Sequence, residues 1–184
     1  MKIAYFDIET NYVGKYEYPD QRLFQDWKNH LITVVGVFLV GRDGDEFVQL
    51  VDEEVSKKNL MHVLRGVRKL VTYNGRSIPD NIKRRVGFDF PVIAARLGVV
   101  LDREFEHTDL VPECWKRDLY GGQKKVEEAL GLRRKLPGRD GGWAQETWRK
   151  YLETRKRKYL DELLLYNKED VFMLREIERL LARF

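Results

Sequence analysis

The feature that most constrains the fold of this chain is a change of hydrophobic period about one third of the way along it. Before that point, three segments have the length and apolar content of β-strands: Lys2–Glu9, Leu31–Val40 and Glu46–Val51. The segment Gly41–Gly44 joins the last two, and its two glycines suit a hairpin. We therefore expect an antiparallel meander in this part of the chain.

After the meander, apolar residues recur at helical spacing and short strands interrupt them. The expected elements are, in chain order, a helix over Glu53–Leu70, a strand over Leu70–Tyr73, a helix over Pro91–Leu97, a strand over Glu104–Leu110, a helix over Gln123–Leu130 that ends at Gly131, a loop over Gly131–Gly142, and a helix over Trp143–Phe184 in one or two pieces. This order predicts an α/β fold with a mixed sheet. The length of 184 residues predicts a single domain over residues 1–184.

Composition excludes several classes of protein. Hydrophobic residues make up 43% of the chain and charged residues 35%, which gives enough apolar content to bury a core and differs from a disordered protein. The single cysteine, Cys114, excludes a disulfide framework and a zinc finger. The longest apolar run, Leu31–Val40, is too short to cross a bilayer, and Asp7 comes too early for a signal peptide. We therefore expect a soluble, cytoplasmic protein with no membrane partner and a net charge of +4.

Two carboxylates break the burial pattern of the first strand. Asp7 and Glu9 lie on the same face as Ile3 and Tyr5, with their Cα atoms roughly 7 Å apart. Like charges at this distance, beside apolar neighbours, raise each other's pKa unless a cation neutralises them. The alternative is a strand end that frays into solvent, where two carboxylates cost little.

A second anomaly lies in the C-terminal helix, where Asp170 falls inside the apolar arc. A carboxylate on the buried side of a helix needs a metal, a buried arginine or a backbone amide as its partner. Tyr166 lies one turn earlier on the same side, whereas Glu169 is expected to point outward. A third carboxylate, Asp89, precedes the helix over Pro91–Leu97, where the alternative to a metal ligand is an N-cap or first-turn acid.

Together these four carboxylates suit a site for two divalent cations. Carboxylate oxygens are the ligands that Mg²⁺ prefers, and Mn²⁺ shares this preference. Two such ions roughly 4 Å apart can activate a water and stabilise the leaving oxygen in phosphodiester hydrolysis. None of the three histidines (His30, His62 and His107) is adjacent to these carboxylates, so we do not expect a histidine-rich zinc site.

Three segments, in this order, resemble the motifs of the DEDD superfamily of 3′–5′ exonucleases in its tyrosine-bearing form. Phe6–Thr10 resembles the first motif, an apolar residue followed by D-x-E-T. Tyr73–Gly75 with Phe88–Pro91 resembles the second, Y-N-G followed by F-D-x-P, and Tyr166–Asp170 fits the third, Y-x-x-x-D. The segment from Gln123 to Gly138 is also similar to that of stand-alone, predicted ribonuclease H-like exonucleases of bacteria and archaea. Family B DNA polymerases carry similar motifs in their proofreading domains.

The resemblance runs from about residue 2 to residue 175 and implies a ribonuclease H-like α/β fold, with a mixed sheet of about five strands flanked by helices. It implies that Asp7, Glu9, Asp89 and Asp170 hold two divalent cations, Mg²⁺ or Mn²⁺. It further implies that Tyr166 orients the attacking water on the 3′-terminal phosphodiester. The implied activity is a metal-dependent 3′–5′ exonuclease that acts on single-stranded DNA or RNA 3′ ends and releases 5′-mononucleotides.

One departure from the family is a basic insert, Arg76–Gly87, inside the second motif, where relatives have very few residues. The insert could contact the substrate backbone, or it could displace Asn74 from the site. It also contains a rival carboxylate, Asp80. Asp89 is the preferred ligand because it keeps the F-D-x-P context.

A nuclease that acts on 3′ ends must hold a polyanion, so we expect basic and aromatic residues near the carboxylates. The residues expected to contact substrate are Thr10, Tyr12, Asn74, Arg133, Arg134 and Arg139. Tyr12 is the best candidate to stack on a terminal base because it follows Glu9 closely. Two alternatives stay open: a nucleic-acid-binding subunit without turnover, docked on a replication or repair protein, and a structure-specific endonuclease.

Overall fold

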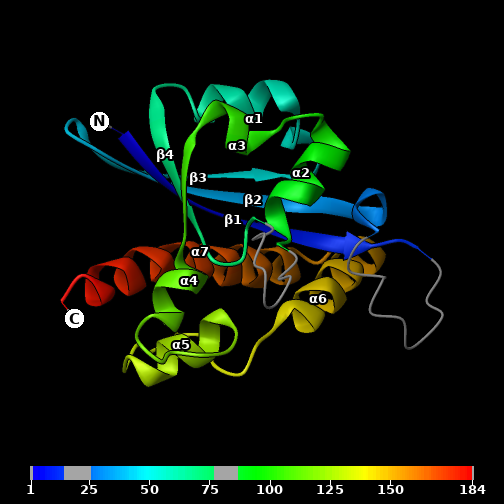
Figure 1. Cartoon of the computed structure of the whole chain (residues 1–184). Coiled ribbons are helices and arrows are strands. Elements are labelled where there is room, and N and C mark those ends of the chain that lie inside the picture. Colours follow the sequence, from blue (N-terminus) through cyan, green and yellow to red (C-terminus); the bar gives the residue numbers. More distant parts are fainter. Residues whose placement is uncertain (1, 15–25, 77–86, 184) are drawn as a thin grey trace.

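The computed structural model describes residues 2–14, 26–76 and 87–183, and a five-stranded mixed sheet lies at its centre (Figure 1). The strands are β1 (Lys2–Tyr12), β2 (His30–Gly41), β3 (Gly44–Val51), β4 (Val67–Thr72) and β5 (Glu106–Asp109). Their order across the sheet is β3-β2-β1-β4-β5. The pairs β1–β2 and β2–β3 are antiparallel, and the pairs β1–β4 and β4–β5 are parallel. The predicted α/β fold with a mixed sheet of about five strands is therefore confirmed.

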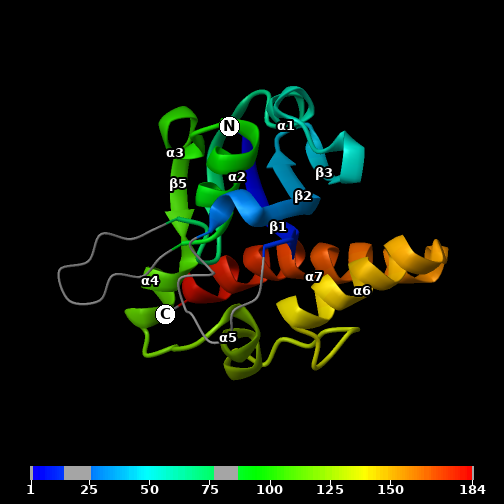
Figure 2. The ribbon, with the colours of Figure 1, turned by 90° about the vertical axis from the view of Figure 1, so that its right-hand side faces the viewer.

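Helices cover both faces of this sheet (Figure 1). They are α1 (Lys57–Val63), α2 (Asp89–Leu97), α3 (Leu101–Glu104), α4 (Leu110–Trp115), α5 (Gln123–Ala129), α6 (Gly141–Thr154) and α7 (Arg157–Leu181), with 3-10 turns η2 (Trp27–Asn29) and η3 (Asp52–Glu54). Helices α1, α2 and α3 lie on one face and α4 to α7 on the other. Figure 2 shows α6 beside α7, against which it packs.

The central strand β1 divides its side chains between two cores. Phe6 belongs to the core beneath α1 and α2, whereas Tyr5 packs with Leu174 of α7 in the core on the opposite face. Because side chains alternate along a strand, Asp7 and Glu9 share the face of Tyr5. The sheet therefore presents both carboxylates towards α7.

Several expected elements are confirmed with small shifts of their ends. The antiparallel meander is present, and its turn pairs Gly41 with Gly44. Gly131 follows α5 with a positive φ of 73°, as a glycine after a helix end should. The C-terminal helical region is in two pieces, α6 and α7, because Arg155 takes a left-handed conformation between them.

The expected helix over Glu53–Leu70 is wrong. Helix α1 begins after Ser56, whose side chain caps it, and ends at Val63. Gly66 then takes a positive φ of 75° and the chain enters β4, which starts at Val67 rather than at Leu70. The apolar spacing that suggested one long helix combines a short helix with the start of a strand, because the buried Val67 and Leu70 of β4 are three residues apart, an interval that also fits a helix.

The two halves of the second motif are adjacent in space. Phe88 N–H donates to the carbonyl of Asn74 at 2.9 Å, and Phe90 N–H donates to the carbonyl of Gly75 at 2.8 Å. The backbone of Asn74 is therefore joined to the start of α2 despite the insert. Residues 77–86 of the insert, with the rival carboxylate Asp80, lie outside the described residues.

Among the helices of the described residues, none combines the length and the apolar character needed to span a membrane.

Candidate active site

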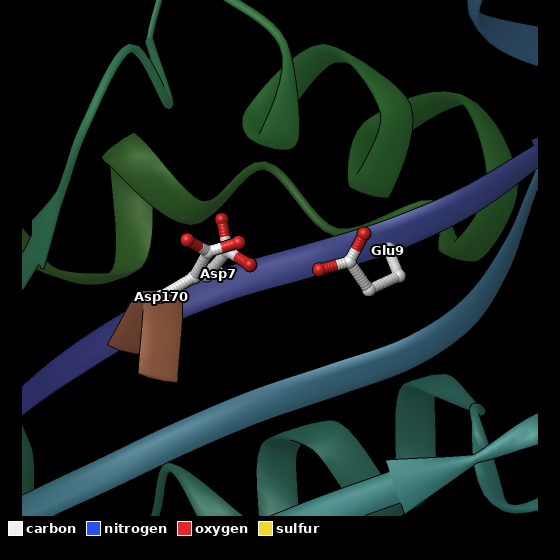
Figure 3. Close-up of side chains that lie close together, drawn as sticks. All are labelled: Asp7, Glu9 and Asp170. Atoms are coloured by element: carbon white, nitrogen blue, oxygen red, sulfur yellow. The ribbon is translucent and has the colours of Figure 1, made fainter. Parts of the chain in front are cut away.

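Three carboxylates from two elements meet on the face of β1 that α7 covers. Asp7 and Glu9 come from β1 and Asp170 from α7, and one oxygen of each lies within 4.8 Å of the others. Figure 3 shows the carboxyl groups of Asp7 and Asp170 next to each other, with Glu9 further along β1. Glu9 and Asp170 are buried, whereas Asp7 is half-buried. The structure therefore brings together three of the four predicted metal ligands.

The fourth predicted ligand, Asp89, lies in the first turn of α2 and is 5% exposed. Its oxygens are outside the 4.8 Å group, but its charge acts on the same cluster. Burial raises the pKa of Asp89 well above its usual range, and the negative charges of Asp7, Asp109 and Asp170 raise it further. Among the described residues, Asp89 Oδ2 has no hydrogen-bond partner and caps no helix. Asp89 is thus a first-turn acid, as the alternative predicted, and not an N-cap, and its buried, unpaired carboxylate oxygen also suits a cation ligand.

Burial and mutual repulsion act on the other carboxylates in the same direction. Burial raises the pKa of Asp7 well above its usual range, and the charge of Asp170 adds to this. Burial, followed by the charges of Asp7 and Asp170, raises the pKa of Glu9. Carboxylates in such a setting ionise together only when positive charge compensates them. An all-oxygen donor set of this charge fits a hard divalent cation such as Mg²⁺ or Mn²⁺.

A glycine opposite Asp7 allows α7 to approach the sheet at this point. Asp7 pairs with Gly36 of β2, and a Cβ atom on Gly36 would lie 2.2 Å from Asn167 Oδ1 and 2.8 Å from Val171 Cγ2. Asn167 Nδ2 donates to Asp7 Oδ2 at 3.0 Å, and Gln49 Nε2 donates to Asn167 Oδ1 at 2.9 Å. This chain of hydrogen bonds, from β3 through α7 to β1, sets the orientation of the Asp7 carboxylate.

Helix α5 supplies a cation next to Tyr166. Lys124 Nζ donates to the Tyr166 hydroxyl at 2.6 Å and lies 3.5 Å from Asp170 Oδ1. It also lies 4.5 Å from the centroid of the Tyr166 ring. Burial raises the pKa of the Tyr166 phenol far above its usual range, and the negative charge of Asp170 raises it further. The hydroxyl therefore keeps its proton at neutral pH. Because its oxygen accepts from Lys124, the phenol has its own O–H to donate to another group.

Asp170 also has an arginine partner, as the alternative to a metal ligand had foreseen. Arg134 Nη2 forms an ion pair with Asp170 Oδ1, and the same guanidinium binds both oxygens of the buried Glu127. The Arg134 side chain is only 6% exposed. These ion pairs hold the Arg134 side chain inside the protein, and its contact with substrate stays a prediction.

Two predicted contacts on β1 are also buried. Tyr12 is 6% exposed, its ring lies 5.0 Å from that of His30, and its hydroxyl donates to Asp26 Oδ2 at 3.3 Å. Thr10 is 7% exposed, with its Oγ1 3.3 Å from His30 Nδ1. The physical reason is that β1 continues past Glu9, after a register shift, and pairs with β2 to Tyr12, so that both side chains pack against His30 of that strand. Both side chains are thus buried in this structure, and stacking of Tyr12 on a base and contact of Thr10 with substrate stay predictions.

Asn74 serves the junction between strands with its backbone. It takes a left-handed φ of 63°, and its N–H donates to Asp109 Oδ1 at 2.9 Å. Asp109, which ends β5, also accepts from the N–H of Arg76 at 3.3 Å and from that of Val111 at 3.0 Å, where it caps α4. A contact between the Asn74 side chain and substrate stays a prediction.

Two of the predicted basic residues are exposed beside the site. Arg133 and Lys124 line a groove of about 370 Å³ between α5 and the loop that follows it. The guanidinium of Arg139 lies 4.8 Å above the ring of Trp143, which in turn lies 5.4 Å from the ring of Tyr166. Two exposed positive charges therefore flank the Tyr166 side of the cluster.

Glu169 was expected to point outward, and this is wrong. The side chain is 8% exposed, Oε1 accepts from the N–H of Lys135 at 2.6 Å, and Oε2 accepts from that of Leu136 at 3.1 Å. The loop after α5 covers this side of α7. The position of a loop cannot be predicted from hydrophobic periodicity, because a loop has no regular apolar spacing. Glu169 thus fastens that loop to α7 beside Asp170.

Four polar residues of the site were given no role from the sequence: Lys124, Glu127, Gln49 and Asn167. Asn167 lies inside the third motif, and Lys124 and Glu127 lie inside the segment that resembles the stand-alone exonucleases. Their positions inside these motifs could have marked them as site residues. Their roles could not be predicted, because these depend on contacts among three elements of the fold. Gln49 gave no signal, because an isolated polar residue in a strand usually faces solvent.

Comparison with known proteins adds one finding. No curated protein matches the chain. The RNase_H_2 family model, described as RNase_H superfamily, matches residues 4–182, which include all of the sheet except the first two residues of β1. A match of this extent agrees with the observed five-stranded sheet and supports a nuclease-type fold. It suggests that the protein hydrolyses nucleic acid. The chain therefore belongs to the RNase H superfamily.

Proposed function

We propose that this protein is a metal-dependent 3′–5′ exonuclease that hydrolyses the terminal phosphodiester of single-stranded DNA or RNA and releases 5′-mononucleotides. The observation that carries the proposal is the carboxylate cluster of Asp7, Glu9 and Asp170, whose oxygens lie within 4.8 Å of one another. Superfamily membership supports hydrolysis of nucleic acid in general. The resemblance of three ordered motifs to the tyrosine-bearing DEDD exonucleases favours attack at a 3′ end. We also propose that residues 1–184 form a single domain.

The proposed metal ligands are Asp7, Glu9, Asp89 and Asp170. Their oxygens fit Mg²⁺ or Mn²⁺, and the unpaired buried Oδ2 of Asp89 favours a cation near the start of α2. When bound, two such cations would supply activation of the attacking water and stabilisation of the leaving oxygen.

The chain's own residues would orient the reacting groups. The Tyr166 hydroxyl accepts a hydrogen bond from Lys124 and so keeps its O–H for the attacking water, which it would orient. The Lys124 ammonium, already at the edge of the cluster, would attract the scissile phosphate. Arg133 and Arg139 are exposed on the same side and would hold backbone phosphates of the strand. Asn74 is proposed as a further contact.

The test is a gel time course with the purified chain, Mn²⁺ or Mg²⁺, and 5′-labelled single-stranded DNA and RNA. The comparison variant is Asp7→Ala, with EDTA as a metal-free control and Asp43→Ala, an exposed acid of the β2–β3 turn, as the matched control. We expect a metal-dependent ladder that shortens from the 3′ end with wild type and Asp43→Ala. Asp7→Ala should lose activity by orders of magnitude and keep strand binding.

Other outcomes identify the alternatives. Cutting of a circular single strand would show an endonuclease and refute the requirement for a 3′ end. Binding of strands without degradation by the wild type, under every metal condition, would contradict an enzyme and favour a binding subunit that works with a replication or repair protein.

A further inference from the structure

We propose that Glu127 and Arg134 are positioning residues for the metal ligand Asp170. In this proposal, Glu127 binds and neutralises Arg134, and Arg134 then orients Asp170 without competing with a divalent cation for it. The inference rests on the proposed function, because it takes Asp170 as a metal ligand.

The first observation is the burial of Glu127, which is 2% exposed on α5. Its Oε2 accepts from Arg134 Nε and its Oε1 from Arg134 Nη2, both at 2.5 Å, and Oε1 also accepts from Gln123 Nε2 at 2.9 Å. A carboxylate is buried at this cost only when charge and hydrogen bonds compensate it. The two parallel contacts fix the plane of the guanidinium.

The second observation is the way in which positive charge reaches Asp170. Arg134 Nη2 contacts Asp170 Oδ1, and Lys124 Nζ, at 3.5 Å, approaches the same oxygen. Both cations therefore contact Oδ1 of the Asp170 carboxylate. Gln123 Nε2 also donates to the backbone carbonyl of Asp170 at 2.9 Å, so α5 and its loop hold this residue by both backbone and side chain.

The charges explain why the arrangement needs a buried acid. Arg134 alone would place a full positive charge against a carboxylate that a divalent cation must also use. Together with Glu127 the pair has no net charge, so Arg134 gives Asp170 direction with little competition. The guanidinium fork binds both oxygens of Glu127 in parallel and still reaches Asp170, whereas a lysine ammonium is a point charge without this planar, bidentate geometry.

The test measures Mn²⁺ affinity directly, by following the electron paramagnetic resonance signal of free Mn²⁺ as the full-length chain is added. Glu127→Gln keeps the shape of the side chain and removes its charge, which leaves Arg134 to compete for Asp170. We expect the Kd for Mn²⁺ to rise roughly 10–100-fold, as for other groups that orient metal ligands. The matched control is Glu128→Gln, which removes the same charge from the next residue, exposed on the same groove, and should leave the Kd within about twofold.

A second variant keeps the proposal testable if Glu127→Gln does not fold by circular dichroism. Arg134→Lys keeps the positive charge but loses the bidentate contact with Glu127 that fixes the direction of the contact with Asp170, so the Kd should again rise at least about tenfold. Folded variants that bind Mn²⁺ within about twofold of wild type would overturn the positioning role. Absence of Mn²⁺ binding by the wild type would instead refute the metal-dependent function.

Discussion

Replacement of Gly36 by alanine tests whether the close approach of α7 to β2 assembles the site. The added Cβ atom would lie 2.2 Å from Asn167 Oδ1 and 2.8 Å from Val171 Cγ2, both inside van der Waals contact. Asn167 has no free space to move into, because it is fully buried and is held by hydrogen bonds to Asp7 and Gln49. Relief of the clash must therefore displace α7 or break this chain of hydrogen bonds.

This geometry allows the losses of stability and of catalytic rate to be estimated. Overpacking of a buried position costs about 1–3 kcal/mol of unfolding free energy, and loss of the Asn167 hydrogen bonds adds about 1 kcal/mol. A shift of α7 of about 1 Å carries Asp170 and Tyr166 with it, and such a misplacement lowers the rate by about 100-fold. Gly36→Ala should therefore lose about 2–4 kcal/mol of stability and about 100-fold in activity.

The assay combines urea unfolding with the initial rate of strand degradation in Mn²⁺. The control is Gly41→Ala on the same strand, where the nearest atom to the added Cβ, Lys2 Cγ, is at 3.6 Å. Gly41→Ala should stay within about 0.5 kcal/mol and twofold in rate of the wild type. A Gly36→Ala variant with the stability and rate of Gly41→Ala would refute the claim that this glycine is needed for the site.

Three further changes have defined expected results. In the absence of divalent cations, Asp7→Asn should raise the Tm by roughly 2–4 °C, because it removes one of several crowded negative charges, and it should abolish the further rise that Mn²⁺ produces in the wild type, both measured by scanning fluorimetry. Burial lowers the pKa of His107 to about 4. Since the unfolded chain binds this proton near pH 6.5, the stability that neutral His107 provides is complete above about pH 6.5 and is lost as the pH falls towards 4. His107→Gln should remove about 1–2 kcal/mol of that pH dependence in urea titrations. Glu169→Gln should lower the unfolding free energy by about 1–2 kcal/mol, because its amide turns a donor towards the N–H of Lys135 or Leu136, whereas Glu162→Gln on the exposed side of α7 should change it by less than about 0.5 kcal/mol in the same measurement.

The parts of the fold that follow from local pattern were predictable. Alternation along β1 placed Asp7 and Glu9 on one face, and helical spacing along α7 placed Asp170 on the buried side one turn after Tyr166. These two patterns brought the main carboxylates together because each depends only on which face of its own element is covered. The glycines at 41 and 44 similarly fixed the turn of the meander.

The structure departs from expectation where contacts between elements bury a side chain. Glu169 is buried because a loop crosses that side of α7. Tyr12 is buried because β1 continues beyond Glu9 and its ring packs against His30 of β2. Arg134 was expected to face substrate as part of a basic loop, yet the buried Glu127, seven residues earlier on α5, holds it inside the protein. Contacts of this kind depend on tertiary packing, which charge and period along the chain do not encode.

The identity of the first product tests most directly whether this protein is a 3′–5′ exonuclease. The substrate is a single strand radiolabelled at its 3′-terminal phosphodiester, incubated with the wild-type chain and Mn²⁺ and sampled before extensive degradation. We predict that the label leaves at once as a 5′-mononucleotide, and that Asp7→Ala releases none. Label that first appears in oligonucleotides, or that is never released while the strand stays intact, would contradict a 3′–5′ exonuclease built on this carboxylate cluster.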